Sequence, residues 1–154
     1  DISRAARSYG VQSYHSVTPI KLQRELVQKI IGHWQEGWGK THNPNRAEAF
    51  TTTGINTSLD EAVAAITEIE GEPPLLVATS ARDIDATRFS FSGLRDEARP
   101  VALVFGTGWG IAPEAESRFD GFLPPVRGPV PYNHLSVRSA VSIILDRFLG
   151  LREE

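Results

Sequence analysis

Apolar residues recur at helical spacing in three segments of the chain, which predicts three helices. The first is expected to begin at Pro19, because proline suits the first helical turn, and to reach Gly32 or Gly37. The second covers residues 59–70 and the third residues 135–149. The apolar positions of the first segment are Leu22, Leu26, Ile30 and Ile31. A short helix is also expected at residues 1–9, with Gly10 as its end. Ser58 with Glu61 forms a capping box at the start of the helix at 59–70, and Gly71 ends that helix. Gly150 ends the helix at 135–149.

Short apolar or β-branched runs lie between these helices and predict strands. Residues 75–78 and 101–105 are fully apolar, as expected for strands buried on both faces of a parallel sheet. Residues 11–17 alternate in character, and residues 49–55 are rich in threonine. Strands that alternate with helices predict one α/β domain over residues 1–154, built on a mainly parallel sheet, and no linker divides it.

Three stretches interrupt this pattern. Residues 37–46 are rich in glycine, asparagine and proline, which predicts an exposed loop. Residues 81–100 are polar and favour neither helix nor strand. Residues 121–131 hold four of the ten prolines, so no regular structure is expected there.

The composition narrows the class of protein. Apolar residues make up 40% and charged residues 23% of the chain, as in soluble globular proteins, and no apolar run approaches the roughly 18 residues of a membrane span. The chain shows no export signal and contains no cysteine, which fits a cytoplasmic protein without a membrane partner. The four histidines lie far apart, so no metal site is expected, and the absence of a G-x-S-x-G elbow argues against a serine hydrolase.

The net charge of −3 counts mildly against binding to nucleic acid, because neutralised phosphates supply much of the affinity of such complexes. Acidic residues concentrate at positions 60–72 and at the last two positions. The sequence therefore leaves room for a basic face on an acidic protein. Its cationic side chains gather in three stretches, namely Arg4 with Arg7, then Lys40, His42 and Arg46, then Arg127 and Arg138.

Ligands of an open parallel sheet bind at the carboxyl ends of its strands, so the residues after each predicted strand are candidates for a site. Thr79 and Ser80 follow residues 75–78 and can hydrogen-bond a ligand or cap the next helix. Residues 106–110 alternate glycine with other residues, so their backbone N–H groups can approach a ligand closely. The other interpretation of these residues is a tight turn around a buried Trp109.

Residues 132–138 gather polar side chains where the proline-rich stretch enters the last predicted helix. Ser136 or Asn133 could be an N-cap, and His134 a structural histidine. Five polar side chains exceed what capping requires, so a functional role is the better interpretation.

Together these stretches resemble the SPOUT superfamily of RNA methyltransferases, which has the α/β-knot fold. The resemblance is to a bacterial branch of predicted RNA methyltransferases that is sometimes fused to tRNA guanine-N1 methyltransferase, and it spans nearly all of the chain. The residues that carry it are 6–11, His33 and Trp34 with Gly37 and Gly39, 43–46, 78–82, 105–110, and 132–140 with 145–147.

The resemblance implies a trefoil knot in the last third of the chain, with residues 121–131 in the crossing. It implies that S-adenosylmethionine (AdoMet) binds in the knot, largely through backbone groups. The implied cofactor contacts are Thr79, Ser80, Gly106, Thr107, Gly108, Leu123, Gly128, Tyr132, Asn133, Leu135 and Ser136. The resemblance also implies a leading strand before Asp1 that this chain lacks, and a homodimer. For the dimer we predict apolar anchors on the last helix, at Val141, Ile144 and Leu145.

The function implied is methylation of RNA, either rRNA or tRNA. Arg4 occupies the place of the arginine that helps activate the substrate hydroxyl in the ribose 2′-O branch, and His134 is our candidate general base. Gly108 and His134 stand where that branch usually has glutamate and asparagine, so the sequence leaves the methylated atom open.

Two other functions fit the residues. One is a non-catalytic AdoMet-binding or dimerisation domain that partners another RNA-modifying enzyme. The other is a small-molecule α/β enzyme that binds a phosphorylated metabolite through residues 106–110.

Overall fold

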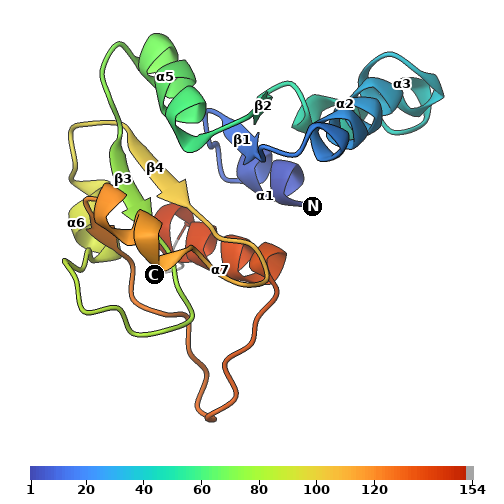
Figure 1. The fold of residues 1–154 in the computed structure, drawn as a ribbon. Coiled ribbons are helices and arrows are strands. Elements are labelled where there is room, and N and C mark those ends of the chain that lie inside the picture. The colour runs from blue at the N-terminus through green and yellow to red at the C-terminus, as the bar shows by residue number, and fades with distance from the viewer. Residues whose placement is uncertain (152–154) are drawn as a thin grey trace. The chain divides into compact units, whose positions relative to one another are not determined.

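The computed structural model describes residues 1–151, which divide into two compact units, Asp1–Gly71 and the described residues from Glu72 onward (Figure 1). Each unit combines helices with parallel strands. The predicted mixed α/β class with parallel strands is therefore confirmed, whereas the single domain stays a prediction. None of the helices in the described part of the chain has the length and hydropathy of a membrane span.

The first unit holds two parallel strands and five helices. Its elements are α1 (Ile2–Ser8), β1 (Tyr14–Val17), α2 (Lys21–Gln35), α3 (Trp38–His42), α4 (Pro44–Ala49), β2 (Thr53–Asn56) and α5 (Leu59–Glu70). Strand β1 runs beside β2 with Tyr14 opposite Thr53. The predicted caps are confirmed, because the Ser58 hydroxyl accepts a hydrogen bond from the Glu61 N–H at 3.2 Å and Gly71 ends α5 at φ +82°.

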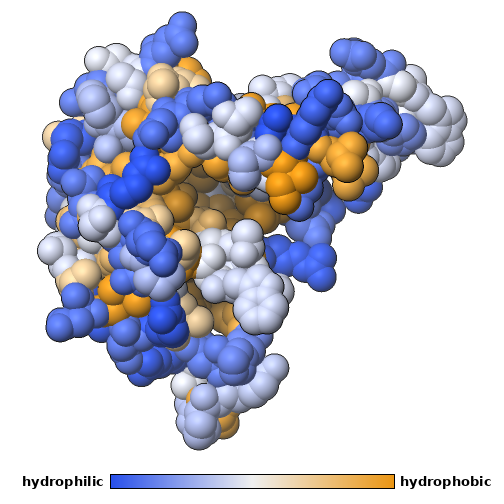
Figure 2. Space-filling model, in the orientation of Figure 1, coloured by the Kyte–Doolittle hydropathy of each residue, from blue (hydrophilic) through white to orange (hydrophobic). Residues whose placement is uncertain are grey.

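Helix α2 confirms the predicted helix but carries most of its apolar stripe on the surface. The side chains of Leu22 and Leu26 are 74% and 58% exposed, and only Ile31 is buried within the helix. Orange apolar groups are visible over α2 in Figure 2. Hydrophobic spacing thus located the helix without predicting what covers it.

Residues 37–46 are mostly exposed as predicted, but the loop predicted there is wrong, because most of these residues lie in two short helices, α3 and α4. The same residue types that indicate loops also begin helices. The Asn43 side chain accepts a hydrogen bond from the Arg46 N–H at 3.0 Å, and Pro44 occupies the first helical position. The strand predicted at residues 49–55 is correspondingly shorter, since β2 begins only at Thr53.

The second unit is built on a three-stranded parallel sheet in the order β4-β3-β5. Its elements are β3 (Leu75–Ala78), α6 (Phe91–Arg95), β4 (Val101–Val104), a 3-10 helix η1 (Pro113–Arg118), β5 (Gly121–Phe122) and α7 (Val137–Leu149). The two apolar strands are confirmed. Residues 121–131 are not wholly irregular as predicted, because Gly121 and Phe122 pair with Val77 and Ala78 of β3.

The core of the second unit lies against this sheet. It is formed by Leu75, Val77, Leu94, Leu123 and Ile144, with phenylalanine and valine side chains packed around them. Helix α7 confirms the helix that the apolar spacing of residues 135–149 predicted, and its Ile144 side chain packs in this core. The prediction that Val141, Ile144 and Leu145 form a dimer face is wrong, because these side chains are only 2%, 3% and 5% exposed.

Candidate functional site

The turn after β3 is held against the neighbouring strand. The backbone N–H and the hydroxyl of Thr79 both donate to the carbonyl of Val104, at 3.0 and 3.1 Å. The Ser80 hydroxyl accepts from the N–H of Arg82 at 3.0 Å. These residues do not cap the next helix, as one interpretation of the sequence held, because Ser90 caps α6.

The glycine loop after β4 is a tight turn closed by the Gly110 N–H, which donates to the Thr107 carbonyl at 2.9 Å. A Cβ atom at Gly106 would lie 2.3 Å from the carbonyl carbon of Gly110, and Gly110 itself adopts φ +82°. A Cβ at Gly108 would meet no atom within 4 Å. Trp109 is fully exposed, so the interpretation of a turn around a buried tryptophan is wrong.

The third stretch, residues 132–138, and the proline-rich segment before it are both tied to the carboxyl end of β3. The Leu123 N–H donates to the Ala78 carbonyl at 2.9 Å while its side chain is buried in the core. The Asn133 amide donates to the Ala81 carbonyl at 2.8 Å. Any contact of Leu123 with a ligand would therefore come from its backbone, whereas Asn133 brings a side chain to the turn.

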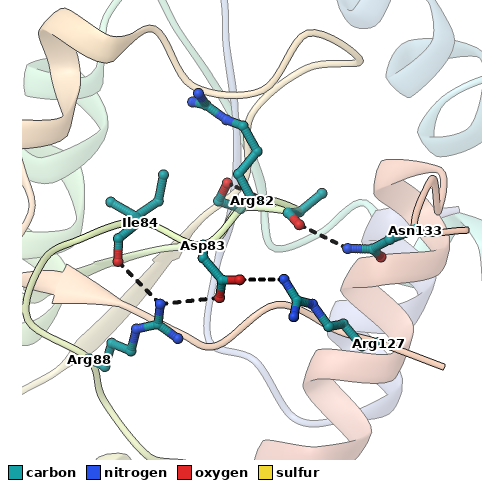
Figure 3. A network of polar contacts seen from close by, with 8 residues as sticks. Arg82, Asp83, Ile84, Arg88, Arg127 and Asn133 are labelled. Atoms are coloured by element: carbon teal, nitrogen blue, oxygen red, sulfur yellow. Dashed lines mark hydrogen bonds and ion pairs between the residues drawn. The ribbon is translucent and has the colours of Figure 1, made fainter. Parts of the chain in front are cut away.

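A charged network joins the same two segments (Figure 3). Asp83 lies between Arg127 and Arg88, pairing with both guanidinium groups, at 3.2 Å in the case of Arg88. Hydrogen bonds from Arg127, and then from Arg88, hold the pKa of the Asp83 carboxyl below its ordinary value. Asp83 is therefore ionised at neutral pH and fixes Arg127 beside the turn.

Two open cavities adjoin this network. The larger, of about 510 Å³, is lined by Ala81, Arg82, Arg127, Val130, Pro131, Asn133 and His134. The smaller, of about 170 Å³, is lined by Ser80, Ala81, Arg82, Ile84, Gly108, Trp109, Gly110, Ile111, Glu116 and Phe122. Ala81 and Arg82 line both, so the three strand-end stretches meet in one place.

Four of the implied cofactor or catalytic residues line these cavities, namely Asn133 and His134 in the larger and Ser80 and Gly108 in the smaller. The Tyr132 ring packs edge-on against His134, with 5.1 Å between ring centroids. The Ser136 hydroxyl caps α7 by accepting from the Ser139 N–H, as the alternative interpretation held. The other implied contacts, which line neither cavity, are Thr79, Gly106, Thr107, Leu123, Gly128, Tyr132, Leu135 and Ser136.

Sequence reasoning missed four residues of this site: Arg82, Asp83, Trp109 and Arg127. Arg82 and Trp109 lie inside the stretches that were singled out, so their position was a usable signal. Asp83 and Arg127 are 44 residues apart, and no local spacing could have paired them. Among the described residues, no group of three or more histidine or acidic side chains could hold a metal ion.

Arg4 belongs to the first unit and is an exposed residue of α1. Its backbone carbonyl accepts a hydrogen bond from the Ser8 hydroxyl at 2.9 Å. Its catalytic role stays a prediction.

The first unit also carries a cationic and aromatic surface, formed by Trp34, Trp38, Lys40, His42 and Arg46. The rings of Trp38 and His42 stack with 3.4 Å between centroids, and Trp38 is 66% exposed. The Arg46 guanidinium lies 4.4 Å from the centroid of Trp34. The surface holds the cations Lys40 and Arg46, while Glu36 and Glu48 flank it in the sequence.

Comparison with known proteins identifies the family of the chain. Residues 1–150 match a family of proteins described as SAM-dependent RNA methyltransferases. Two proteins named tRNA (guanine-N(1)-)-methyltransferase are similar to 97% of this chain, one from Oleidesulfovibrio alaskensis at 40% identity and one from Nitratidesulfovibrio vulgaris at 44% identity. The chain spans only 35% of the length of each of these relatives.

Solved structures show the same fold at low sequence identity. TrmJ from Zymomonas mobilis (Z. mobilis ZM4) aligns over 98% of this chain and 62% of its own, with a TM-score of 0.63 and 15% identity. The SpoU methyltransferase AviRb from Streptomyces viridochromogenes, solved with AdoMet, aligns over 96% of this chain and 50% of its own, with a TM-score of 0.55 and 18% identity. The predicted similarity to SPOUT methyltransferases is thus confirmed at the level of the fold.

Proposed function

Because the chain belongs to the family of SAM-dependent RNA methyltransferases, we propose that it transfers a methyl group from AdoMet to a nucleotide of RNA. The observation that carries this proposal is the convergence of three strand-end stretches on the two adjoining cavities. The larger cavity falls within the range of about 300–1,000 Å³ typical of small-molecule sites. Its place at the carboxyl ends of parallel strands is where such sheets bind ligands.

The residues of the two cavities fit the chemistry of AdoMet. Ile84, Ile111 and Phe122 give the smaller cavity an apolar wall suited to an adenine ring. Arg82 and Arg127 give the larger cavity cations suited to the carboxylate of the methionine part. Open space at Gly108 leaves its backbone accessible to a ligand.

His134 and Arg4 are the residues we assign to the chemistry. Bound AdoMet supplies an electrophilic methyl group. The His134 imidazole would accept the proton released by the acceptor atom, and the edge-on Tyr132 ring limits the orientations of that imidazole. The Arg4 guanidinium would stabilise negative charge developing on the acceptor.

Residues 123–136 would form the threaded part of a trefoil knot. The contacts of Leu123, Arg127 and Asn133 with the β3 end support this, because they hold the segment across the strand where the crossing would lie. A homodimer would complete the site, and light scattering on the purified protein tests that state directly.

The RNA we propose as substrate is tRNA, because two relatives carry tRNA methyltransferase names. The cationic and aromatic surface of the first unit supports RNA binding, since cations pair with phosphates and exposed rings stack on bases. We place the reaction in the bacterial cytoplasm.

A second function is favoured by the length of the match. The chain corresponds to about a third of relatives that are named as tRNA methyltransferases, so it could serve such an enzyme as an AdoMet-binding or dimerisation domain. This domain would bind AdoMet without turning it over on any RNA.

One experiment separates the two functions. Total RNA from cells with and without the gene is digested, and the nucleosides are compared by mass spectrometry. A methylated nucleoside that disappears, and returns with the wild-type chain but not with His134→Ala, supports methyl transfer by this chain. Tight AdoMet binding by calorimetry, with the modification restored equally by His134→Ala, supports the non-catalytic domain.

A further inference from the structure

Trp109 is the most exposed large side chain at the strand-end site. Its exposure is 100%, and it stands between Gly108 and Gly110, which offer it no side chains to pack against. The turn that carries it is nevertheless well defined, because Gly110 bonds to Thr107 and the backbone at Gly106 contacts the backbone at Gly110. The indole is therefore presented on a fixed turn.

A single exposed aromatic side chain is common on protein surfaces and by itself indicates nothing. Trp109 differs because it lines the smaller cavity together with Ser80, Gly108 and Phe122. The residue therefore borders the space that would hold the cofactor, and its indole is open to solvent. A ring so placed can contact a second molecule that approaches the cavity from outside.

We propose that Trp109 stacks on a nucleobase of the acceptor nucleotide and holds it beside the cavity, an inference that rests on the proposed methyl transfer. The acceptor atom must come into near contact with the methyl group, so the nucleotide has to be positioned there. A base can stack on the indole only if its face is free, so the proposed substrate is a looped-out or single-stranded nucleotide. Stacking on an aromatic ring accepts every base and supplies affinity without reading the sequence.

Arg82 adds a charge at the same place. It lines both cavities, and its side chain is 66% exposed although it pairs with Glu116 at 3.4 Å. A guanidinium that lines the same cavity as Trp109 gives a flanking phosphate a partner. The pair therefore suits a nucleotide, which offers a planar base and an anionic linkage, better than it suits an apolar peptide.

The inference is tested on the full chain with an unmodified tRNA transcript, a short single-stranded RNA and the matching duplex as probes. Trp109→Ala is expected to weaken binding of the single-stranded RNA roughly 10- to 100-fold, and Trp109→Phe to recover most of it. AdoMet affinity by calorimetry should fall less than the affinity for the single-stranded RNA. In turnover, the Trp109→Ala defect should appear chiefly in KM. Ile69→Ala, which removes another exposed apolar side chain, on α5, is the matched control and should bind RNA like the wild type.

Fluorine NMR of protein labelled with 5-fluorotryptophan reports on the contact without any turnover. The resonance lost in Trp109→Phe belongs to Trp109, and it should shift with the single-stranded RNA and stay in place with the duplex. If Trp109→Ala binds RNA with unchanged affinity, the inference is overturned. It is also overturned if the variant loses AdoMet affinity or its oligomeric state and keeps its RNA affinity. If the wild type binds RNA through Trp109 but transfers no methyl group, the proposed function fails and the stacking inference holds.

Discussion

The second unit has a continuous core of large apolar side chains, whereas the first unit buries few of its own. Val77, Leu94 and Leu123 are each 3% exposed or less and belong to one continuous cluster. In the first unit the buried positions are mostly small, such as Ala6 and Ala49, while Leu22 and its neighbours on α2 are exposed. The difference indicates that the second unit carries its own stability, and that the first offers an apolar helix face to other contacts.

The largest effect that this comparison predicts is on core stability. Leu123→Ala should lower the free energy of unfolding by about 2–5 kcal/mol, because it removes a buried side chain and leaves a cavity. Leu26→Ala, the same substitution on α2, should stay within about 0.5 kcal/mol of the wild type. Urea denaturation of both variants measures this. A similar loss of unfolding free energy in the two variants would mean that α2 is covered in solution, and it would contradict the difference between the two units.

Replacing a glycine by alanine should give the next largest change in stability, and the change should have opposite signs in the two units. Gly106→Ala should destabilise the protein by about 1–3 kcal/mol, because the new methyl group meets the backbone at Gly110. Gly32→Ala in α2 should stabilise it by about 0.5–1 kcal/mol, because a Cβ there meets nothing within 4 Å and alanine favours the helix. Thermal melting distinguishes the two. As a further control, Gly108→Val should keep the wild-type melting temperature yet lose AdoMet affinity.

Helix caps give a smaller and nearly equal effect. Ser58→Ala and Ser136→Ala should each cost about 0.5–2 kcal/mol, since each hydroxyl accepts from a backbone N–H in the first turn of its helix. Only Ser136→Ala should also weaken AdoMet binding, because Ser136 is among the implied cofactor contacts. Melting curves measure the loss of stability, and calorimetry measures the AdoMet affinity of each variant. Equal AdoMet affinity in the two variants would remove Ser136 from the site.

The smallest effect concerns two exposed carboxyl groups, one in each unit. The pKa of Glu61 is lowered by hydrogen bonds from Thr57, and that of Asp83 by hydrogen bonds from Arg127 and Arg88. Each depressed pKa contributes stability that is present above the unfolded-state value, 4.5 for Glu61 and 3.8 for Asp83, and is lost as pH falls through the folded-state value.

Salt should separate these two groups. The pKa of Asp83 should return toward 3.8 at high ionic strength because its partners are charged, whereas the pKa of Glu61 should hardly move. NMR titration of the two carboxyl groups at low and high salt measures this. An Asp83 pKa that ignores salt would contradict the ion-pair network.

Local signals were enough to predict most of the elements. Residues 75–78 were assigned as a strand from their apolar run alone, and Ser58 and Gly71 bounded α5 correctly because capping depends on neighbours in sequence. Asn43 and Pro44 led to the wrong prediction of a loop, because asparagine and proline favour both loops and helix starts. The exposure of Leu22 could not be predicted, because periodicity shows that a face is apolar and not what lies against it.

The candidate site was predicted by its position and missed in its details. The strand-end rule and the resemblance singled out Ser80, Gly108, Asn133 and His134, and these four residues line the cavities. The pairing of Asp83 with Arg127 depends on a crossing between distant segments, which no spacing in the sequence encodes. The exposure of Trp109 was missed because tryptophan is usually expected inside a protein.

The two bonds that join the strand-end turn to the crossing segment have a kinetic consequence. Both the Asn133 bond to Ala81 and the Arg127 pair with Asp83 lie at the surface, while Leu123 beside them is anchored in the core. These two surface bonds can break while Leu123 stays packed, so the segment that carries Arg127 and Asn133 can open locally with the core intact. Such opening should become more frequent as salt weakens the Arg127 pair, and it should not follow the melting temperature of the protein.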